Sequence, residues 1–215
     1  MPPIISIVGK SDSGKTTLLE GLIANLKQRG YKIAVLKHAA EDIELDTVNK
    51  DSWRFSQAGS EVSAVSSTRK LAIIKNLEHD LAPQELVQFI GSDYDLILTE
   101  GFKQSDYPKI EVHRKGQGAA LLSPPEQLLA VVTDEPLKVT VPQFSKDEVP
   151  EIADLIEKTL TLGKESDVDL FIDDTFVPLS KPAKNLLFRT LVAMVSSLKG
   201  SNKMKSLRLF LRRKA

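Results

Sequence analysis

Residues 9–16 have the types and the spacing of a loop that binds the phosphates of a nucleotide. They read Gly-Lys-Ser-Asp-Ser-Gly-Lys-Thr and fit the pattern G-x-x-x-x-G-K-[ST]. In such a loop, glycines allow backbone N–H groups to approach phosphate oxygens closely. The Lys15 ammonium would bind the β- and γ-phosphates, and the Thr16 hydroxyl would bind Mg²⁺. The candidate ligands of the nucleotide are Gly9, Lys10, Ser11, Asp12, Ser13, Gly14, Lys15, Thr16 and Thr17.

The residues on either side of this loop predict the strand and the helix that must position it. Residues 4–8 are short, β-branched and apolar, as in a buried strand of a parallel sheet. Residues 16–28 have leucines and an isoleucine at helical spacing, and residues 31–37 are typical of a second strand. We therefore predict a right-handed βαβ unit, with the helix N-terminus directed at the bound anion.

The alternation of strands and helices continues to residue 162. We expect strands at 61–66, 71–75, 94–99, 109–113, 128–133 and 139–141, and helices at 51–58, 83–90 and 145–162. This order predicts an α/β P-loop NTPase domain over residues 1–162, with a mostly parallel sheet flanked by helices.

Residues 163–166, which are polar and begin with glycine, are the predicted boundary of a small second part. Residues 163–215 contain strand patterns at 168–172 and 176–179, a helical pattern at 182–198 and a final strand pattern at 207–211. We interpret them as a ββαβ unit. Its size is near the lower limit for independent stability, so we expect it to pack on the main domain or on a second subunit.

A carboxylate for Mg²⁺ is expected at the end of a strand beside the loop. Glu100 follows an apolar strand, whereas Asp95 begins the same strand and would lie at its far end. We therefore favour Glu100 as the metal ligand. Lys37 ends the second strand, at the edge of the sheet where ligands collect. A solvated acid at a strand end is the alternative interpretation of Glu100.

Asp134 is the candidate for recognising the base. It ends a late strand, so its carboxylate could accept hydrogen bonds from a guanine ring. An equally good interpretation is a turn-initiating aspartate before Glu135 and Pro136. Asn49-Lys50-Asp51 lacks the spacing of a guanine-binding motif.

The composition excludes several classes of function. The chain has no cysteine and three histidines, which excludes disulfides, iron–sulfur clusters and thiolate metal sites. Its 29 basic and 29 acidic residues balance, which argues against a general affinity for nucleic acid. No apolar stretch is long enough to span a bilayer, and we expect a cytoplasmic protein without membrane contact.

Several segments together resemble the accessory GTP-binding protein of molybdopterin-guanine dinucleotide synthesis, the MobB type. The resemblance covers about residues 3–160. It rests on Val8 to Leu18, Val35-Leu36-Lys37-His38, Lys50-Asp51-Ser52-Trp53-Arg54, Ala58-Gly59, Leu98-Thr99-Glu100-Gly101-Phe102-Lys103, Pro108-Lys109-Ile110-Glu111-Val112 and Asp134. The Glu-Gly-Phe-Lys and Pro-Lys-Ile-Glu-Val segments are far more specific than the phosphate loop.

The resemblance implies GTP and Mg²⁺ as ligands, at most slow hydrolysis, and a homodimer. It also implies a partner, the molybdenum cofactor guanylyltransferase that joins GMP to molybdopterin, and contact with that molybdopterin intermediate. Glu100 and Asp46 would complete the magnesium shell begun by Thr16. Lys37 and Lys103 would flank the phosphates or the pterin. The sequence departs from the family at residues 39–49, where the further histidines and a Pro-Gly pair are absent.

Two other classes of function are compatible with the sequence. A small-molecule kinase or ligase on the same scaffold would need an arginine near the γ-phosphate, and Arg54 and Arg69 are the candidates. A binding-only role would use the basic residues 203–215, although the alternation at 207–212 is also typical of a half-buried strand. A metallochaperone GTPase is disfavoured because the cysteines and histidines that carry a metal are missing.

Overall fold

The computed structural model describes residues 1–39, 51–91, 93–118, 120–162, 168–173 and 175–196, together with residues 207 and 209. It divides into two compact units: a main unit of residues 2–160, and a C-terminal unit of residues 161–215 with Met1. The expected boundary at 163–166 lies outside the described residues.

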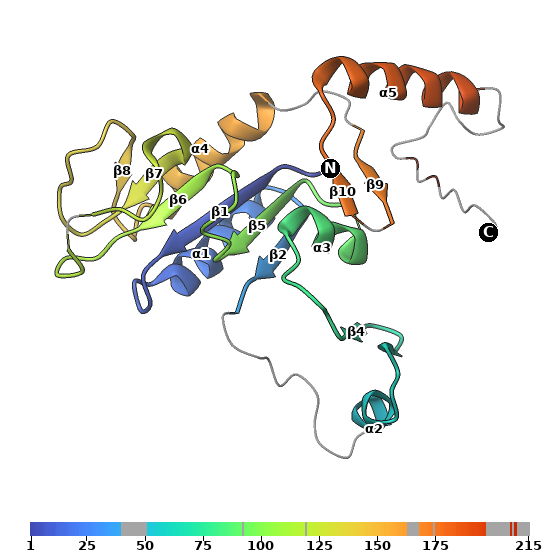
Figure 1. The fold of residues 1–215 in the computed structure, drawn as a ribbon. Helices are drawn as coiled ribbons and strands as arrows, with labels where there is room; N and C mark the ends of the chain where they lie inside the picture. The colour runs from blue at the N-terminus through green and yellow to red at the C-terminus, as the bar shows by residue number, and fades with distance from the viewer. Residues whose placement is uncertain are drawn as a thin grey trace. The chain divides into compact units, whose positions relative to one another are not determined.

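The main unit is built on a six-stranded sheet in the order β2-β5-β1-β6-β7-β8, in which every neighbouring pair is parallel (Figure 1). Its strands are β1 (Ile4–Gly9), β2 (Ile33–Lys37), β5 (Leu96–Glu100), β6 (Lys109–Val112), β7 (Leu128–Val132) and β8 (Gln143–Phe144). The predicted parallel α/β fold is confirmed. Because β1 lies between β5 and β6, its carboxyl end meets the ends of both neighbours.

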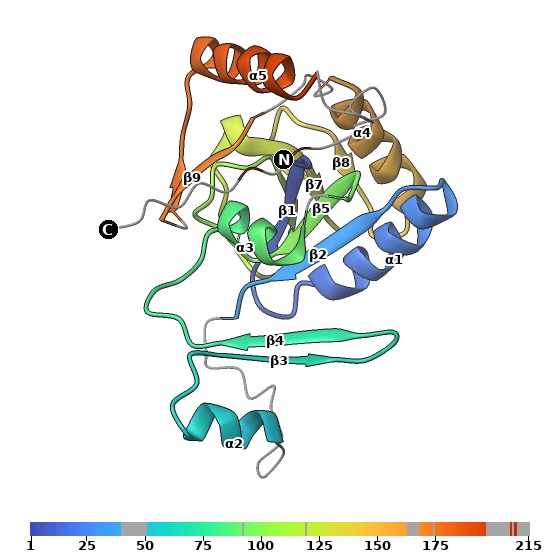
Figure 2. The same cartoon turned by 90° about the vertical axis from the view of Figure 1, so that its right-hand side faces the viewer.

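Helices cover both faces of this sheet. Helices α1 (Lys15–Gln28) and α4 (Val149–Leu162) lie on one face and α3 (Pro83–Ile90) on the other (Figure 2). All six residues of β1 are buried, as expected for a strand covered on both faces. Leu22 of α1 and Ile156 of α4 pack with Ile5 and Leu98 in one core, and each is at most 1% exposed. This packing fixes α1, and with it the phosphate loop, against the centre of the sheet.

A helix and a hairpin occupy the connection between β2 and α3. Helix α2 (Asp51–Gln57) is followed by the antiparallel strands β3 (Val62–Ser66) and β4 (Leu71–Lys75), as the sequence predicted. The turn closes through a hydrogen bond from Ser67 N–H to Lys70 O of 2.8 Å. The apolar side chains of Val65 and Leu71 are 52% and 64% exposed, so this hairpin presents an apolar surface.

The predicted strand at 139–141 is wrong; the strand is β8, which begins at Gln143. The side-chain amide of Gln143 explains the difference, because it accepts a hydrogen bond from Leu137 N–H and donates one to Leu137 O, both at 2.8 Å. This pair of hydrogen bonds closes residues 137–143 into a loop and places Gln143 and Phe144 beside β7. Helix α4 also begins at Val149 rather than at 145, because Glu148 accepts a hydrogen bond from Ser145 N–H at 2.6 Å in a preceding turn.

The C-terminal unit contains the antiparallel strands β9 (Leu170–Ile172) and β10 (Thr175–Val177), followed by α5 (Lys181–Ser196). These are the first three elements of the predicted ββαβ unit. The last, expected at 207–211, falls largely outside the described residues.

A short 3-10 helix, η1 (Pro125–Gln127), precedes β7 in the main unit. Within the described part of the chain, none of the helices is long and apolar enough to cross a membrane.

Candidate nucleotide-binding site

The phosphate loop connects β1 to α1 and is formed by residues 9–14, with Lys15, Thr16 and Thr17 in the first turn of the helix. Gly9 is required by close packing, because a Cβ there would lie 2.4 Å from Val112 O. Gly14 has φ 96° and caps α1 without a side-chain hydrogen bond. The first N–H groups of the helix therefore remain available to an anion.

Lys15 folds back onto the loop. Its Nζ donates a hydrogen bond to Lys10 O at 2.6 Å. Burial lowers the pKa of Lys15 from its ordinary value of 10.5, and this effect is opposed by the negative charge of Glu100. A partly desolvated ammonium held by a neutral carbonyl is well suited to exchange that carbonyl for a phosphate oxygen.

Three predicted site residues meet at the carboxyl edge of the sheet. Thr16 Oγ1 donates a hydrogen bond to Glu100 Oε2 at 3.3 Å, and Lys37 Nζ lies 3.4 Å from Glu100 Oε1. The register explains the meeting, because Glu100 of β5 is level with Ile7 of β1 on one side and with Lys37 of β2 on the other. The Glu100 side chain is 14% exposed. Asp95, at the other end of β5, instead accepts a hydrogen bond from Lys32 N–H.

The donor set at this edge fits Mg²⁺. A hydroxyl and one carboxylate are hard oxygen donors, and Mg²⁺ is commonly held by one or two carboxylates together with phosphate oxygens and water. In the described part of the chain, no group of three or more His, Cys, Asp or Glu side chains forms a metal site of its own. Asp46, the other candidate metal ligand, lies outside the described residues.

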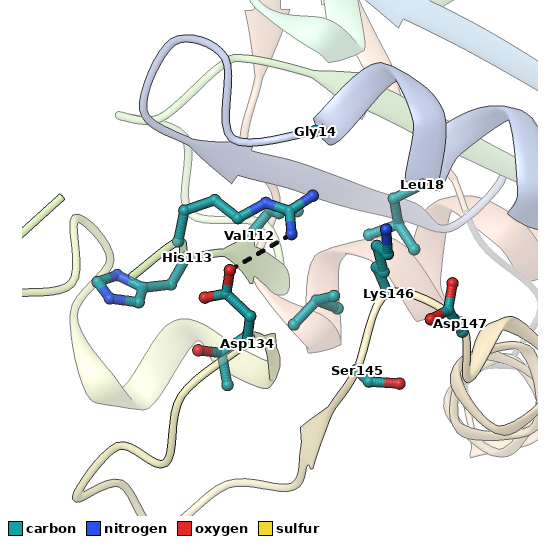
Figure 3. Close-up of a pocket in the computed structure, with 11 residues that line it drawn as sticks. Gly14, Leu18, Val112, His113, Asp134, Ser145, Lys146 and Asp147 are labelled. Atoms are coloured by element: carbon teal, nitrogen blue, oxygen red, sulfur yellow. Dashed lines mark ion pairs between the residues drawn. The ribbon is translucent and has the colours of Figure 1, made fainter. Parts of the chain in front are cut away.

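Asp134 lines a cavity of about 150 Å³ beside the start of α1 (Figure 3). The cavity is lined by residues from the α1 start, the ends of β6 and β7, and the turn before α4: Gly14, Leu18, Val112, His113, Arg114, Val132, Thr133, Asp134, Ser145, Lys146 and Asp147. Asp134 Oδ1 accepts a hydrogen bond from Lys115 N–H at 2.7 Å, which is the main cause of its lowered pKa. The carboxylate is therefore held ionised at the wall of the cavity.

Arg114, which the sequence pattern did not single out, contacts the phosphate loop. It is the second residue after β6, so its position at the carboxyl edge of the sheet was the available signal. Its Nε donates a hydrogen bond to Ser13 O at 2.8 Å, and its Nη1 lies 3.5 Å from Asp134 Oδ2. The arginine that contacts the phosphate loop is thus Arg114. Arg54 instead pairs with Asp51 within α2, and Arg69 lies in the hairpin turn.

Other predicted residues are placed around this centre. Lys10 Nζ donates to Gln117 O, and Ser11 O accepts a hydrogen bond from Gln117 Nε2 at 3.2 Å. Asp12 adopts a φ of 58° within the loop. Lys103 is near enough to Lys15 for its charge to lower the pKa of Lys15 further.

Two charged residues of the Pro-Lys-Ile-Glu-Val segment are interior and bind loops. Lys109, fully buried, donates from Nζ to Ser105 O, to Tyr107 O at 3.2 Å and to Gln127 Oε1 at 2.5 Å. Glu111, 2% exposed, accepts hydrogen bonds from Leu122 N–H at 2.7 Å and Ser123 N–H at 2.9 Å. These two side chains therefore hold loops of the main unit, whereas Arg114, two residues after the segment, contacts the phosphate loop.

Comparison with known proteins identifies the family. Residues 4–134 match the family described as molybdopterin guanine dinucleotide synthesis protein B, MobB. The chain belongs to the MobB family. The resemblance stated from the sequence is confirmed, and so is the P-loop NTPase fold.

Relatives of the MobB family match different lengths of this chain. The "molybdopterin-guanine dinucleotide biosynthesis adapter protein" of Haemophilus influenzae is 38% identical over 159 residues, which are 74% of this chain and 89% of that protein. The putative adapter protein of Methanocaldococcus jannaschii is 26% identical over 234 residues and covers 96% of each chain. The match to the archaeal relative therefore extends into the C-terminal unit.

Solved MobB structures have the same fold as the main unit. A crystal structure of molybdopterin-guanine biosynthesis protein B is 34% identical, with a TM-score of 0.54 over 74% of this chain and 99% of its own. The crystal structure of Bacillus subtilis MobB is 30% identical, with a TM-score of 0.60 over 73% of this chain and 96% of its own.

Proposed function

We propose that this protein binds GTP with Mg²⁺ at the phosphate loop and acts as an adapter in the biosynthesis of molybdopterin guanine dinucleotide. The observation that carries the proposal is the meeting of Thr16, Glu100 and Lys37 beside the loop, in a MobB-family chain. The adapter role is supported by relatives that are named adapter proteins of this pathway.

The loop would bind the triphosphate in three ways. Backbone N–H groups at the start of α1 would donate to phosphate oxygens. The Lys15 ammonium would leave Lys10 O and pair with the β- and γ-phosphates. Mg²⁺ would neutralise phosphate charge, and Thr16 and Glu100 would hold it. Asp134 would accept hydrogen bonds from the N1–H and the 2-amino group of guanine, which adenine cannot offer together.

We expect at most slow hydrolysis. The two oxygens of Glu100 already contact Thr16 and Lys37, which suits a metal ligand better than a general base. Holding the nucleotide for a partner is the role that this arrangement supports. The proposed partner is the guanylyltransferase that joins GMP to molybdopterin, and Lys37 and Lys103 are cations that could contact phosphates or the anionic molybdopterin.

We further propose a homodimer, and the exposed apolar side chains of α2 and the β3–β4 hairpin support it. Phe55, Val65 and Leu71 are each more than half exposed, and covering them would remove apolar area from water. Light scattering should give a dimer mass for the native protein and a monomer mass for Leu71→Glu. A native monomer would contradict the proposed dimer and leave the proposed nucleotide site untouched.

The function is tested by titration calorimetry of the full chain with GTP and with ATP, each with Mg²⁺ and with a chelator. The expected result is tighter binding of GTP, strengthened by Mg²⁺, together with co-purification of the guanylyltransferase. Equal affinity for ATP and no association with that enzyme would refute the proposal. Rapid turnover that depends on a small acceptor molecule would instead identify a kinase or a ligase.

A further inference from the structure

Arg114 contacts both parts of the proposed nucleotide site. Through Nε it holds the carbonyl of Ser13 in the phosphate loop, and through Nη1 it pairs with Asp134 at the wall of the cavity. The second contact is the dashed line to Asp134 in Figure 3. The two contacts use different nitrogens of one planar group, so the guanidinium links the loop and the carboxylate in a fixed geometry.

The Arg114 side chain has room beside the phosphate loop because residue 14 is a glycine. A Cβ on Gly14 would lie 2.9 Å from Arg114 Nη2, so the guanidinium lies against the residue that caps α1. The Arg114 side chain is 32% exposed. A side chain enclosed to this degree loses little further conformational freedom when it makes its contacts. The phosphate loop defines the position of its guanidinium.

Residues next to Arg114 also contact either Asp134 or the phosphate loop. Lys115 N–H donates to Asp134, Gln117 Nε2 donates to Ser11 O, and Lys10 Nζ donates to Gln117 O. We name residues 114–117 the clasp. The clasp bonds the phosphate loop at Ser11, Ser13 and Lys10, and it bonds the carboxylate of Asp134 at both oxygens.

Asp134 needs such support if it is to distinguish bases. Its side chain is 44% exposed, so without partners the carboxylate would rotate freely in water. An ionised carboxylate offers about four acceptor positions, so Arg114 and Lys115 can hold the group while it still accepts hydrogen bonds from a base. A carboxylate held in one plane matches the adjacent N1–H and 2-amino donors of guanine.

We propose that Arg114 is a positioning residue that determines base specificity, by fixing Asp134 toward the base while holding the phosphate loop through Ser13. This inference rests on the proposed function, in which Asp134 binds guanine. It adds that recognition of the base and binding of the phosphates depend on each other through one side chain.

The test compares the affinities of Arg114→Gln for GTP and for ATP, each with Mg²⁺. Loss of the Ser13 contact weakens both nucleotides modestly, and loss of the Asp134 contact weakens GTP about tenfold more than ATP, the scale of one charge-assisted hydrogen bond. Arg114→Lys keeps the charge without the planar fork, and its preference for GTP should be intermediate. Arg189→Gln, the same change at an exposed site on α5, should leave both affinities at the native value.

A double-mutant cycle shows whether Arg114 acts through Asp134. In an Asp134→Asn background, Arg114→Gln should no longer change the ratio of GTP to ATP affinity. If Arg114→Gln alone left the ratio of GTP to ATP affinity unchanged, the inference would be overturned. The proposed function would still stand, provided that the native protein prefers GTP. A native protein without preference for GTP would overturn both. Should Arg114→Gln fail to fold by circular dichroism, the ratio measured for Arg114→Lys decides.

Discussion

Thr16 and Glu100, which are 84 residues apart in the chain, meet at 3.3 Å because β1 and β5 are parallel neighbours that end at the same edge of the sheet. The hydroxyl is positioned by the first turn of α1 and the carboxylate by the last residue of β5. Without a cation the pair is joined by a hydrogen bond. If Mg²⁺ were bound, the hydroxyl oxygen of Thr16 and the carboxylate of Glu100 would hold it, since both are oxygen ligands that Mg²⁺ prefers.

Glu100→Gln should remove most of the effect of Mg²⁺ on GTP binding. An amide oxygen is a weaker ligand than a carboxylate, so the apparent affinity for Mg²⁺ should fall by about 10–100-fold. In the presence of a chelator, GTP should bind to Glu100→Gln no more weakly than to the native protein, because a negative charge near the phosphates has been removed. Calorimetry at a series of Mg²⁺ concentrations measures both effects. Asp95→Asn, at the opposite end of β5, is the matched control, and a Glu100→Gln protein with native magnesium dependence would exclude Glu100 as a ligand.

GTP binding should take up protons at alkaline pH. Burial lowers the pKa of Lys15 below 10.5 in the free protein, and phosphates would raise it in the complex. A group whose pKa rises on binding contributes fully below its free pKa, and its contribution is lost as pH rises above that value toward the pKa of the complex. Affinity should therefore decline as pH approaches 10.5 from below. Calorimetry in two buffers of different ionisation enthalpy counts the protons, and an uptake of zero in this range would contradict the prediction.

Asp134→Asn should exchange the preference for guanine for one for xanthine. Xanthine has a carbonyl where guanine has its 2-amino group, so an amide donor at residue 134 would pair with it. We expect GTP affinity to fall by about 10–100-fold, because a charge-assisted hydrogen bond is lost and a donor faces a donor. Competition between GTP and xanthosine triphosphate gives the ratio directly. Asp147→Asn, on the other side of the cavity, is a useful comparison, and an equal response from both variants would show that Asp134 has no special role.

Glu111→Gln should destabilise the fold rather than change nucleotide preference. Its buried carboxylate accepts two backbone hydrogen bonds, and an amide can accept only through its single oxygen. We expect a loss of about 1–3 kcal/mol in the free energy of unfolding, measured by urea denaturation. Glu126→Gln, at an exposed site in the same region, should change it by less than about 0.5 kcal/mol. A stable Glu111→Gln protein with altered GTP selectivity would assign Glu111 to the site instead.

The sequence predicted the features of the site that follow from local pattern and from sheet topology. The glycines and Lys15 of the loop lie within one short segment, and Glu100 and Lys37 could be placed because parallel strands end at a common edge. Arg114 also follows a strand at this edge, but its position there does not reveal that its side chain reaches Ser13 in the loop. The same limit explains the strand wrongly expected at 139–141, because the Gln143 side chain closes that segment against Leu137. The hydrophobic periodicity of a sequence does not predict side-chain contacts between distant segments.

The central position of β1 has a consequence for how the protein folds. Ile4 of β1 pairs with Ile97 and Ser6 pairs with Lys109, so β1 has neighbours that are synthesised much later. Contacts so distant in sequence form slowly, because a long loop must close before they stabilise anything. Until residue 112 has emerged, the apolar β1 strand lacks a partner on at least one side. Nascent chains of this protein should therefore expose an aggregation-prone strand, and they are natural clients of a chaperone that binds extended apolar segments.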